Sequence, residues 1–594
     1  MHSKAFNRCL LAATVSVASM GNAFAIDFEI GEIKGQFDSS LSVGASWGTQ
    51  DASQKLIDTT NGGRGFSSGG DDGRQNFQKG ETFSKIFKGV HDLQLTYGDT
   101  RAFVRGKYWY DFELKDEDRP FKQISDEGRD MSARSSGAEF LDAFIAQKYS
   151  IADRSGDVRL GKQVVSWGES LFIGNSINSI NPLDVAALRR PGAELKEGLI
   201  PVNMVYVSQG LTDNLSAEAF YQLEWQPYAL DNCGTFFGAD PIPKGCNRNF
   251  TAGLAEIAPL EPIAAAAGLP FGFNGREGVF VPRESDHDAS DGGQWGLSLH
   301  WMGDGTEYGA YYMNYHSRSP TLALRPATGV TNFINTVLPA SGLPAEEQFA
   351  LGLGTAAGNS SYFLDYPENI HLYGVSFSTT LPTGTAWSGE ISYRPNAPVT
   401  INSADLGGGL LNPALRALTG SNIEPTVNGE EGQVIQGYRR KEITQAQTSF
   451  VHIFDPMLGA EYLSVATELG VTHIGGLESL DTQRYGRDSV YGDINQGGRN
   501  GYYTATSWGY RAYAKLSYPN VFAGVNLMPN LFWSHDVDGY SPVFNEGSKS
   551  VGLGLDADYR NTYTASLSYT NNFGGDFNTS VDRDFVALSF GVNF

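Results

Sequence analysis

The sequence predicts an all-β protein, a transmembrane antiparallel β-barrel of about 18 strands. Three observations support this class: a strictly alternating last strand, short turns that alternate with long connections, and no apolar helical segment. After the N-terminal signal no run of roughly 18 apolar residues occurs, so a membrane-spanning helix is not expected.

The C-terminal segment 583–594 gives the clearest strand signal. Its apolar residues fall on every second position from Val586 to Phe594, and small or polar residues separate them. The last strand of a membrane barrel pairs with the first and leaves no open edge in lipid. We therefore predict that Phe590, Val592 and Phe594 form the closure signal. The alternative is an edge strand of a soluble β-sandwich.

The first 25 residues have the pattern of a secretory signal peptide that is removed on export. Lys4 and Arg8 supply the positive end, a short apolar core follows, and Ala23 and Ala25 frame a small-residue cleavage site. We expect one barrel domain, residues 26–594, in the outer membrane of a Gram-negative bacterium.

The charge of the chain limits which classes of partner are expected, and its cysteines indicate the redox state of its compartment. The chain has 43 basic and 66 acidic residues, which argues against nucleic acid and against an anionic membrane surface as partners. Cys233 and Cys246 lie close together in an exported chain, so a disulfide bond is predicted. Closing such a short loop stabilises a fold by roughly 3 kcal/mol.

In chain order, a first and a last strand enclose eight hairpins, each formed by two alternating segments joined by a few turn residues. The predicted strands are 35–47, 86–97, 101–113, 139–149, 157–166, 202–209, 214–225, 294–301, 307–315, 371–379, 385–394, 446–454, 462–473, 506–518, 524–533, 550–557, 562–571 and 583–594. Short turns are expected on the periplasmic side with both termini, and long loops outside. The longest loops are expected at about 226–293, 316–370 and 395–443.

Charged residues within the strands predict which face is turned to the lumen. In the strand 506–518, Arg511 and Lys515 alternate with apolar residues. A charge facing lipid at mid-membrane would cost about 2–4 kcal/mol. Arg511, Lys515, Glu218 and Glu390 should therefore face the lumen, which in a barrel of this size is too wide for side chains alone to fill.

The connection after the strand 157–166 carries a long composite motif. It reads G-K-Q-V-V-S-W-G-E from Gly161, N-P-L-D from Asn181 and R-R-P-G-A-E from Arg189. This run, with the hairpin that follows it, resembles the domain of unknown function 1302 family of bacterial outer-membrane proteins. The resemblance covers nearly the whole mature chain and implies the barrel architecture. It also implies an association with exporters and with degradation pathways for lipid-like compounds, and so a periplasmic or inner-membrane exporter component as a partner.

The same connection holds charges of both signs beside the predicted pore. One interpretation is a constriction whose transverse field screens solutes. The other is a latch in which Arg–carboxylate pairs hold the connection against the wall. The residues alone do not separate the two. The candidate pore residues are Trp167, Glu169, Asn181, Asp184, Arg189, Arg190, Glu194, Arg511 and Lys515.

Three outer loops contain apolar stretches, at 254–273, 330–338 and 406–418, and two of them suit short helices. Folded into the barrel mouth, the stretches would form a plug or an apolar pocket. The alternative is that the loops pack on one another outside the barrel. The candidate apolar surface consists of Leu260, Ile263 and Leu269.

Metal sites and catalytic motifs are not predicted. Asp71–Asp72, 286–291 and 536–539 resemble fragments of calcium loops, but none has the full ligand spacing, so solvated acidic loops are expected. Nucleophile, zinc-protease and phosphate-loop motifs do not occur. A barrel-embedded hydrolase with a site assembled from several strands is the remaining enzymatic alternative. We expect a protein without enzyme activity and without a cofactor.

These observations favour an outer-membrane channel or transporter for hydrophobic or amphipathic small molecules. Apolar loop surface favours such solutes over sugars and ions. The alternatives are a general polar-solute porin and a surface binding protein that uses the barrel as an anchor. The expected partners are the solute, outer-membrane lipid and the barrel-assembly machinery.

Overall fold

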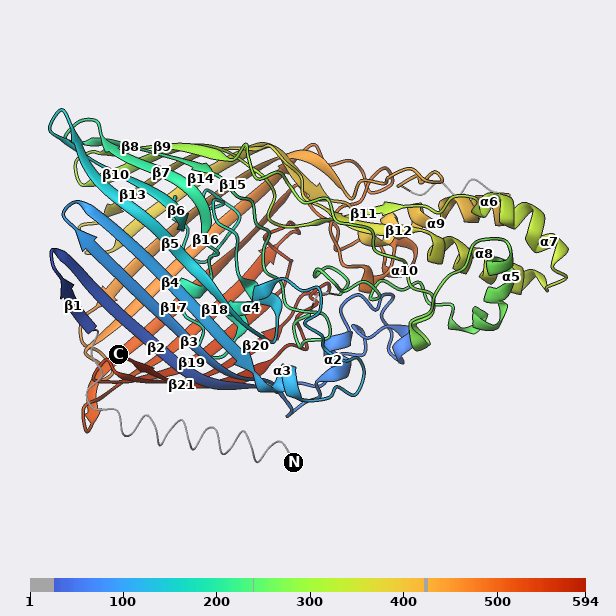
Figure 1. Ribbon diagram of the computed structural model, residues 1–594, viewed down its shortest axis with the longest axis horizontal. Helices are drawn as coiled ribbons and strands as arrows, with labels where there is room; N and C mark the ends of the chain where they lie inside the picture. Colours follow the sequence, from blue (N-terminus) through green and yellow to red (C-terminus); the bar gives the residue numbers. More distant parts are fainter. Residues whose placement is uncertain (1–25, 239, 421–425) are drawn as a thin grey trace.

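The computed structural model describes residues 26–238, 240–420 and 426–594. The signal-peptide prediction at residues 1–25 lies outside the described residues. Figure 1 shows a barrel with an elongated extension at one end, and both the C-terminus and β1 lie at the other end.

Eighteen antiparallel strands form the barrel wall, and each pairs with its two neighbours. The prediction of about 18 strands is confirmed. The wall strands are β2 (Ile33–Gly48), β3 (Thr82–Tyr97), β4 (Thr100–Asp111), β5 (Ser136–Ile151), β6 (Arg154–Gln163), β7 (Val202–Gly210), β8 (Leu215–Gln222), β9 (Trp295–Met302), β10 (Thr306–Tyr315), β13 (Ile370–Thr380), β14 (Ala386–Thr400), β15 (Tyr438–Phe454), β16 (Tyr462–Gly475), β17 (Thr506–Phe522), β18 (Val525–Asp538), β19 (Lys549–Tyr559), β20 (Tyr563–Phe573) and β21 (Phe585–Asn593).

The barrel closes between its first and last wall strands. β2 pairs with β21 from Ser40 opposite Asn593 to Gly48 opposite Phe585. Below this seam Ser39 and Phe594 exchange two backbone hydrogen bonds, of 2.6 and 2.8 Å. The first residues of β2 pair with the short strand β1 (Ile26–Ile30). The predicted closing role of the C-terminal strand therefore matches the backbone pairing.

Short and long connections lie at opposite ends of the barrel. Tight turns, such as Gly98 and Asp99 between β3 and β4, are at the end that carries the C-terminus (Figure 1). Several strands run further toward the outer end than the sequence predicted, and β14 and β15 differ most. β14 reaches Thr400 and β15 begins at Tyr438, because Val399 and Arg439 continue the pairing past a β-bulge.

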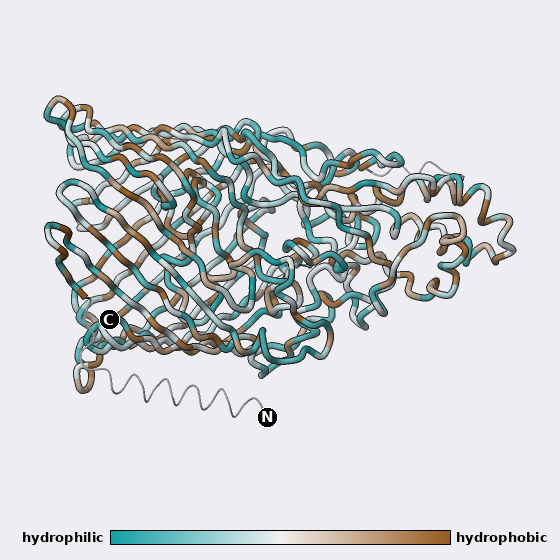
Figure 2. The backbone as a smooth tube through the Cα atoms, in the orientation of Figure 1, coloured by the Kyte–Doolittle hydropathy of each residue, from teal (hydrophilic) through white to brown (hydrophobic). Residues whose placement is uncertain are grey.

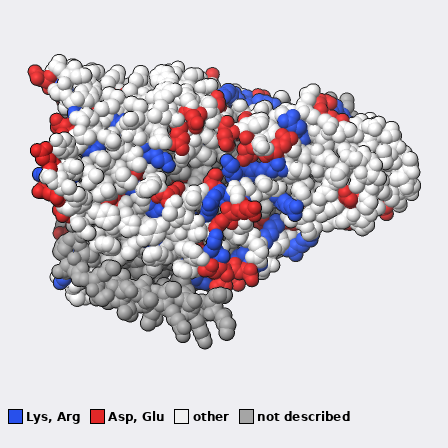
Figure 3. Space-filling model, viewed as in Figure 1, with Lys and Arg blue, Asp and Glu red and all other residues white. Residues whose placement is uncertain are grey.

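The two faces of the strands differ as the alternation predicts. In β19, Leu553 and Leu555 are exposed on the outside, whereas Gly552, Gly554 and Asp556 take the alternating positions. Figure 2 shows apolar and polar residues alternating along the wall strands. Figure 3 shows a wall with few charges and a band of charged residues where the barrel meets its outer loops.

The outer connections hold the helices and a two-stranded sheet of β11 (Thr321–Arg325) and β12 (Ser361–Asp365). The helices are α2 (Asp72–Asn76), α3 (Phe112–Asp116), α4 (Val185–Arg189), α5 (Glu261–Ala266), α6 (Val330–Asn332), α7 (Leu338–Ala340), α8 (Ala345–Asn359), α9 (Ser403–Thr419) and α10 (Ile494–Gly497). In the part of the chain that is described, none of the helices has the length and apolar character needed to cross a membrane.

Helices α5 to α9 form the extension that projects beyond the barrel, which we call the helical extension (Figure 1). Its core contains Phe333, Ile334, Leu338 and Leu351, all buried. Nearer the barrel, Cys233 and Cys246 are joined by the predicted disulfide bond.

Candidate functional site

The connection between β6 and β7, residues 164–201, folds into the barrel lumen, and we call it the inward loop. It carries α4, which lies within the outline of the barrel in Figure 1. Its contacts reach β14, β15 and β16 on one side and β2, β3 and β4 on the other. The loop therefore crosses the lumen between two parts of the wall.

Two wall glutamates hold the first half of the inward loop through its backbone. Glu468 of β16 accepts hydrogen bonds from the N–H groups of Leu171, Phe172 and Ile173 at 3.0, 2.7 and 2.6 Å. Glu390 of β14 accepts from the N–H of Glu169 and, at 3.3 Å, of Ile177. A carboxylate that receives several backbone N–H groups fixes a turn without using a side chain of that turn.

The tip of this half is fixed from β14 and β15. Arg394 donates to the side-chain and backbone oxygens of Asn175 at 2.8 and 2.7 Å. Gln445 donates to the carbonyl of Gly174 at 2.9 Å. At Gly168, φ is +85° and a Cβ would collide with the Glu390 carboxylate, so this position requires glycine.

Two wall lysines hold the second half through buried ion pairs. Lys107 of β4 lies 2.8 Å from Asp184, and Lys88 of β3 pairs with Glu197. Ser40 of β2 donates to Glu194 at 3.0 Å. All four partners of the two ion pairs are nearly inaccessible to solvent, so the pairs are shielded from salt.

The two arginines of the inward loop contact neighbouring connections. Arg189 pairs at 2.5 Å with Asp231, which lies in the β8–β9 connection. Arg190 donates to the carbonyl of Ser132 at 2.6 Å and stacks on the Trp109 ring at 4.6 Å. Within the loop, Lys196 lies 3.0 Å from Glu194. The ion pairs between the loop and the barrel strands are therefore made by Lys107 and Lys88 of the wall and not by the arginines of the loop.

Two other predicted pore residues are buried supports. The Trp167 indole N–H donates to Glu218 of β8 at 2.7 Å. Asn181 accepts from the N–H of Val165 and donates to two backbone carbonyls, which ties the two ends of the inward loop together. Both residues position the loop and neither lines an open passage.

Glu169 is the predicted pore residue whose surroundings are most acidic. Burial, and next the carboxylates of Glu307 and Glu390, raise the pKa of Glu169 to about 7. On β17, Arg511 pairs with Asp536 at 2.6 Å, and Lys515 lies on the same strand face. The lumen therefore has an acidic region near Glu169 and basic groups on β17.

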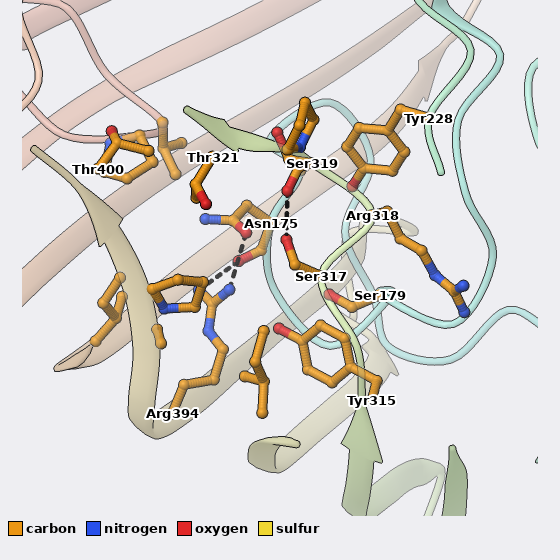
Figure 4. Close-up of a pocket in the computed structure, with 18 of the residues that line it drawn as sticks. Asn175, Ser179, Tyr228, Tyr315, Ser317, Arg318, Ser319, Thr321, Arg394 and Thr400 are labelled. Carbon is orange, nitrogen blue, oxygen red and sulfur yellow. Dashed lines mark hydrogen bonds between the residues drawn. The ribbon is translucent and has the colours of Figure 1, made fainter. Parts of the chain in front are cut away.

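A cavity of about 530 Å³ lies on the outer side of the inward loop. Neither Asp nor Glu lines it, although the chain carries a net charge of −23. Figure 4 shows Tyr228, Tyr315 and several small hydroxyl residues around it, with Arg394 reaching toward Asn175. The lining combines Leu183, Tyr228, Tyr315, Ser317, Arg318, Ile370, Arg394, Pro398 and Ile443 with further small residues.

Arg318 lines this cavity and is fixed by hydrogen bonds to the residues around it. It donates to Gln222 at 2.5 Å and to the carbonyls of Ile180 and Gln226, each at 3.1 Å. Burial lowers the pKa of Arg318 to about 10, so its guanidinium remains charged at neutral pH. Neither Arg318 nor Arg394 forms an ion pair with a described carboxylate, which leaves the cavity with a positive fixed charge.

Apolar residues of the inward loop are exposed within the lumen. Leu171 is 46% and Leu195 is 88% exposed, and Phe172, Leu183 and Leu188 are also exposed. The Phe172 ring meets Phe532 of β18 edge-on, which shows that this part of the loop faces β18. Barrel lipid cannot cover these side chains, so they form an apolar surface inside the lumen.

The predicted apolar loop surface lies elsewhere. Leu260, Ile263 and Leu269 pack against the core of the helical extension and are partly buried. The loops thus pack on one another outside the barrel, which is the alternative kept open above. At the tip, Pro262, Ile263 and Val337 line a shallow apolar surface, and Figure 3 shows that this end is almost free of charge.

The expectation of solvated acidic loops fails for part of these segments. Asp71 and Asp72 are buried together with Glu277. Asp286 pairs with Arg283 at 2.8 Å, and Asp536 with Arg511. Asp288, Asp291 and Asp538 are exposed, as expected. The prediction was wrong for Asp71 and Asp72 because a distant segment buries them, which local spacing cannot reveal.

Sequence reasoning also missed four wall residues that hold the inward loop. Strand alternation predicted that Glu390 faces the lumen, but it did not predict that Glu390 accepts hydrogen bonds from the backbone of the inward loop. Lys88, Lys107 and Glu468 were not singled out. The available signal was a charged residue in the middle of a predicted membrane strand, which must face the lumen and find a partner there.

A closed antiparallel barrel with an apolar outer wall and a loop folded into its lumen defines the class: the protein is an integral outer-membrane β-barrel. Within this class the chain belongs to the family described as "Protein of unknown function (DUF1302)", whose model matches residues 7–594. The family prediction is confirmed. The comparison with curated proteins gives no match.

Among solved structures, the chain is similar to Acinetobacter baumannii OccAB1, with 10% identity over 95% of this chain and 97% of that one and a TM-score of 0.39. It is similar to Pseudomonas aeruginosa OccD3 (OpdP), with 10% identity over 97% and 93% and a TM-score of 0.36. It is also similar to Salmonella typhi OmpF in complex with daunomycin, with 8% identity over 96% of this chain and 100% of that one and a TM-score of 0.34. Likeness at this level transfers no function.

Proposed function

We propose that the protein is an outer-membrane channel for amphipathic small molecules that combine an apolar body with a neutral or anionic polar group. The observation that carries the proposal is the exposed apolar surface of the inward loop inside the lumen, with Leu171, Phe172 and Leu195 as its main residues. Exposed apolar side chains in a narrowed passage provide contacts that an amphipathic solute can use and a sugar cannot.

The cavity beyond the inward loop supports the polar part of this proposal. Its lining offers hydroxyl groups from Tyr228, Tyr315 and Ser317, and the positive charge of Arg394, without an opposing carboxylate. A solute arriving from outside meets this polar and basic surface first and the apolar surface of the loop next. Sites that combine apolar walls with a few polar groups are typical of small-molecule recognition.

Flux through the reconstituted protein tests the proposal. We expect discrete conductance in planar bilayers and uptake of an anionic amphipathic dye, 1-anilinonaphthalene-8-sulfonate, into proteoliposomes. The triple substitution Leu171→Ser, Phe172→Ser and Leu195→Ser should slow dye uptake about tenfold, because the apolar contacts of each side chain are lost. Its KCl conductance should be unchanged or higher.

A matched variant on the outside distinguishes the lumen from the helical extension. Ile263→Ser with Leu269→Ser alters apolar residues that pack in the extension and should leave dye uptake at the parental rate. Parental dye uptake by the lumen triple variant would instead identify a polar-solute porin. A folded protein without any conductance would show that the barrel is an anchor.

Surface binding is the second candidate function. The observation in its favour is the shallow apolar surface at the tip of the helical extension, where Pro262, Ala266 and Ala267 are exposed. Exposed apolar patches of monomeric proteins often mark binding sites. Conductance separates the two candidates, since only the channel requires an open lumen.

A further inference from the structure

Four acidic residues from two outer connections meet in one buried cluster above the barrel wall. Asp71 and Asp72 belong to the β2–β3 connection, at the start of α2. Asp240 and Glu277 belong to the β8–β9 connection. Asp72 is 0% and Asp240 is 3% exposed, and the other two are equally buried. We call this group the acidic cluster.

The oxygen atoms of the cluster are close enough to share one ion. Asp71, Asp72 and Glu277 each offer a carboxylate oxygen, and the three atoms lie within 4.8 Å of one another. Calcium binds oxygen ligands at about 2.3–2.6 Å, so oxygens on opposite sides of one ion are roughly 5 Å apart. The observed spacing fits a single ion between the carboxylates.

The positive charge that forms ion pairs with the acidic cluster is smaller than the negative charge of its four carboxylates. Lys122 of the β4–β5 connection lies 2.8 Å from Asp72 and 2.7 Å from Glu277. The remaining hydrogen bonds come from neutral groups: Asn61 donates to both Asp71 and Glu277 at 3.0 Å, and Asn249 donates to Asp72 at 2.7 Å. Lys122 is therefore the one cationic side chain among the described residues that forms ion pairs with the four carboxylates, while Arg129 and Arg583 act on Asp240 from a longer distance.

Asp240 supplies an independent indication of a missing partner. Both of its carboxylate oxygens are buried, and no N–H or hydroxyl group of the described residues donates to them. Its carboxyl group lies against that of Asp72, so it is directed into the acidic cluster. One oxygen of Asp71 also lacks a donor. Buried carboxylates without donors are strongly unfavourable unless a cation or a proton joins them.

We propose that the acidic cluster is a calcium site in which Asp71, Asp72 and Glu277 supply the first ligands, while Asp240, whose carboxyl group lies beside that of Asp72, turns toward the bound ion. The available donors are all oxygens, because Cys233 and Cys246 nearby are joined as a disulfide. Oxygen-only sites favour hard cations, and calcium accepts irregular arrangements of carboxylates more readily than magnesium does. Bound calcium would link the β2–β3 and β8–β9 connections, and Lys122 would attach the β4–β5 connection to them.

Calcium titration of the full-length protein tests the site. The protein is refolded in detergent without lipopolysaccharide, so that lipid-bound calcium is absent, and is stripped with EDTA. Isothermal titration with CaCl2 should show one site per chain with a Kd of about 10⁻⁴–10⁻³ M, the range of extracellular calcium modules. Magnesium should bind at least about tenfold more weakly.

Substitutions assign the ligands. Asp72→Asn and Glu277→Gln should each weaken calcium binding by about tenfold or more, since each removes a charged ligand. Asp240→Asn, which keeps the shape of the side chain, should weaken it as well. Asp51→Asn is the control, because Asp51 lies in the same connection but its side chain is 80% exposed; its Kd should equal the parental value.

Two results would overturn the proposal. The first is the absence of calcium binding by the folded parent protein at 10 mM CaCl2, a concentration roughly ten times the expected Kd; this would mean that protons neutralise the cluster. The second is parental calcium affinity in folded Asp72→Asn and Glu277→Gln variants. The parental titration does not depend on any variant folding, so a negative result there overturns the proposal even if the variants misfold.

Discussion

The inward loop is a single connection of the barrel, the helical extension is built from three, and the two regions are held differently. Charged groups fix much of the inward loop: Lys107 with Asp184, Lys88 with Glu197, and the backbone acceptors on β14 and β16. In addition, Trp167, Ile177 and Ile180 of the loop pack with wall residues in a buried apolar cluster. The helical extension is fixed by apolar packing around residues such as Phe333 and Leu351.

The surroundings explain this difference. The extension projects into water, where burying apolar side chains is the main favourable contribution to folding. The inward loop lies in the lumen, where some of its apolar side chains pack against the wall, its exposed leucines remain uncovered, and its buried ion pairs are protected from bulk water. The loop is therefore held through its backbone and through buried charges in addition to apolar packing.

Breaking the wall should abolish both regions at once. Deleting Phe594, or replacing it with Asp, removes or disturbs the residue that closes the seam with Ser39. We expect the folded, heat-modifiable form to fall to below about a tenth of the parental amount, because an unclosed barrel leaves unpaired backbone groups in lipid. Semi-native gel electrophoresis of outer membranes measures this, and a parental level of folded protein would contradict the closing role.

Breaking one buried ion pair should release the inward loop alone. Lys107→Met leaves Asp184 buried without its cation, at a cost of about 3–5 kcal/mol. Hydrogen exchange of the loop amides in the folded protein should accelerate by roughly 10²- to 10³-fold, because this cost favours local opening. The control is Lys79→Met, whose exposed pair with Asp51 is worth about 0–1 kcal/mol. Unchanged loop protection in Lys107→Met would show that the ion pair contributes little.

A substitution that creates a cavity in the core of the helical extension should leave conduction through the lumen unchanged. Leu351→Ala removes a fully buried side chain of α8, at a local cost of about 2–5 kcal/mol. Exchange of the α8 and α9 amides should rise, while single-channel conductance and barrel heat-modifiability stay at parental values. A conductance change in this variant would mean that the two regions are coupled and that the comparison above is too simple.

Acidification should produce the smallest effect, and only in the lumen. Because the pKa of Glu169 is raised to about 7, its carboxyl is neutral at lower pH and charged at higher pH. Raising the pH from about 6 to about 8 should increase the cation-over-anion permeability ratio roughly twofold, since a negative charge appears beside the pore. Glu169→Gln should lose this response. The groups facing Glu169 are Glu307 and Glu390, with His300 bonded to Glu307, so the same pH response in Glu169→Gln would assign it to them.

The strands of the barrel wall were predictable from the sequence, but the contact partners of the loop residues were not. Alternation with a period of two identified every wall strand, because each strand must present one face to lipid regardless of its neighbours. The partners of Asp184 and Glu197 could not be predicted in this way. Lys107 and Lys88 lie far away in the chain, and only the closed barrel brings them together with the loop.

The acidic cluster shows the same limit. Asp71 and Asp72 are adjacent in sequence and looked solvated, whereas Glu277 and Asp240 come from a connection about 200 residues further along. Composition did predict two outer helices, since the apolar stretch at 254–273 contains α5 and the stretch at 406–418 lies within α9, but it did not predict α8. It did not predict which surface those helices would cover, because that depends on contacts between separate loops.

The paired edge of β2 also determines how a solute can leave. β2 is bonded to β3 on one side and, on the other, to β1 from Ile33 to Phe37 and to β21 from Ser40 to Gly48. A lateral gate at this junction would have to separate consecutive backbone hydrogen bonds within the bilayer, where each unsatisfied group costs several kcal/mol. The junction of first and last strands is thus closed toward the lipid by continuous backbone pairing, so under the proposed channel function it offers no lateral exit into the lipid leaflets.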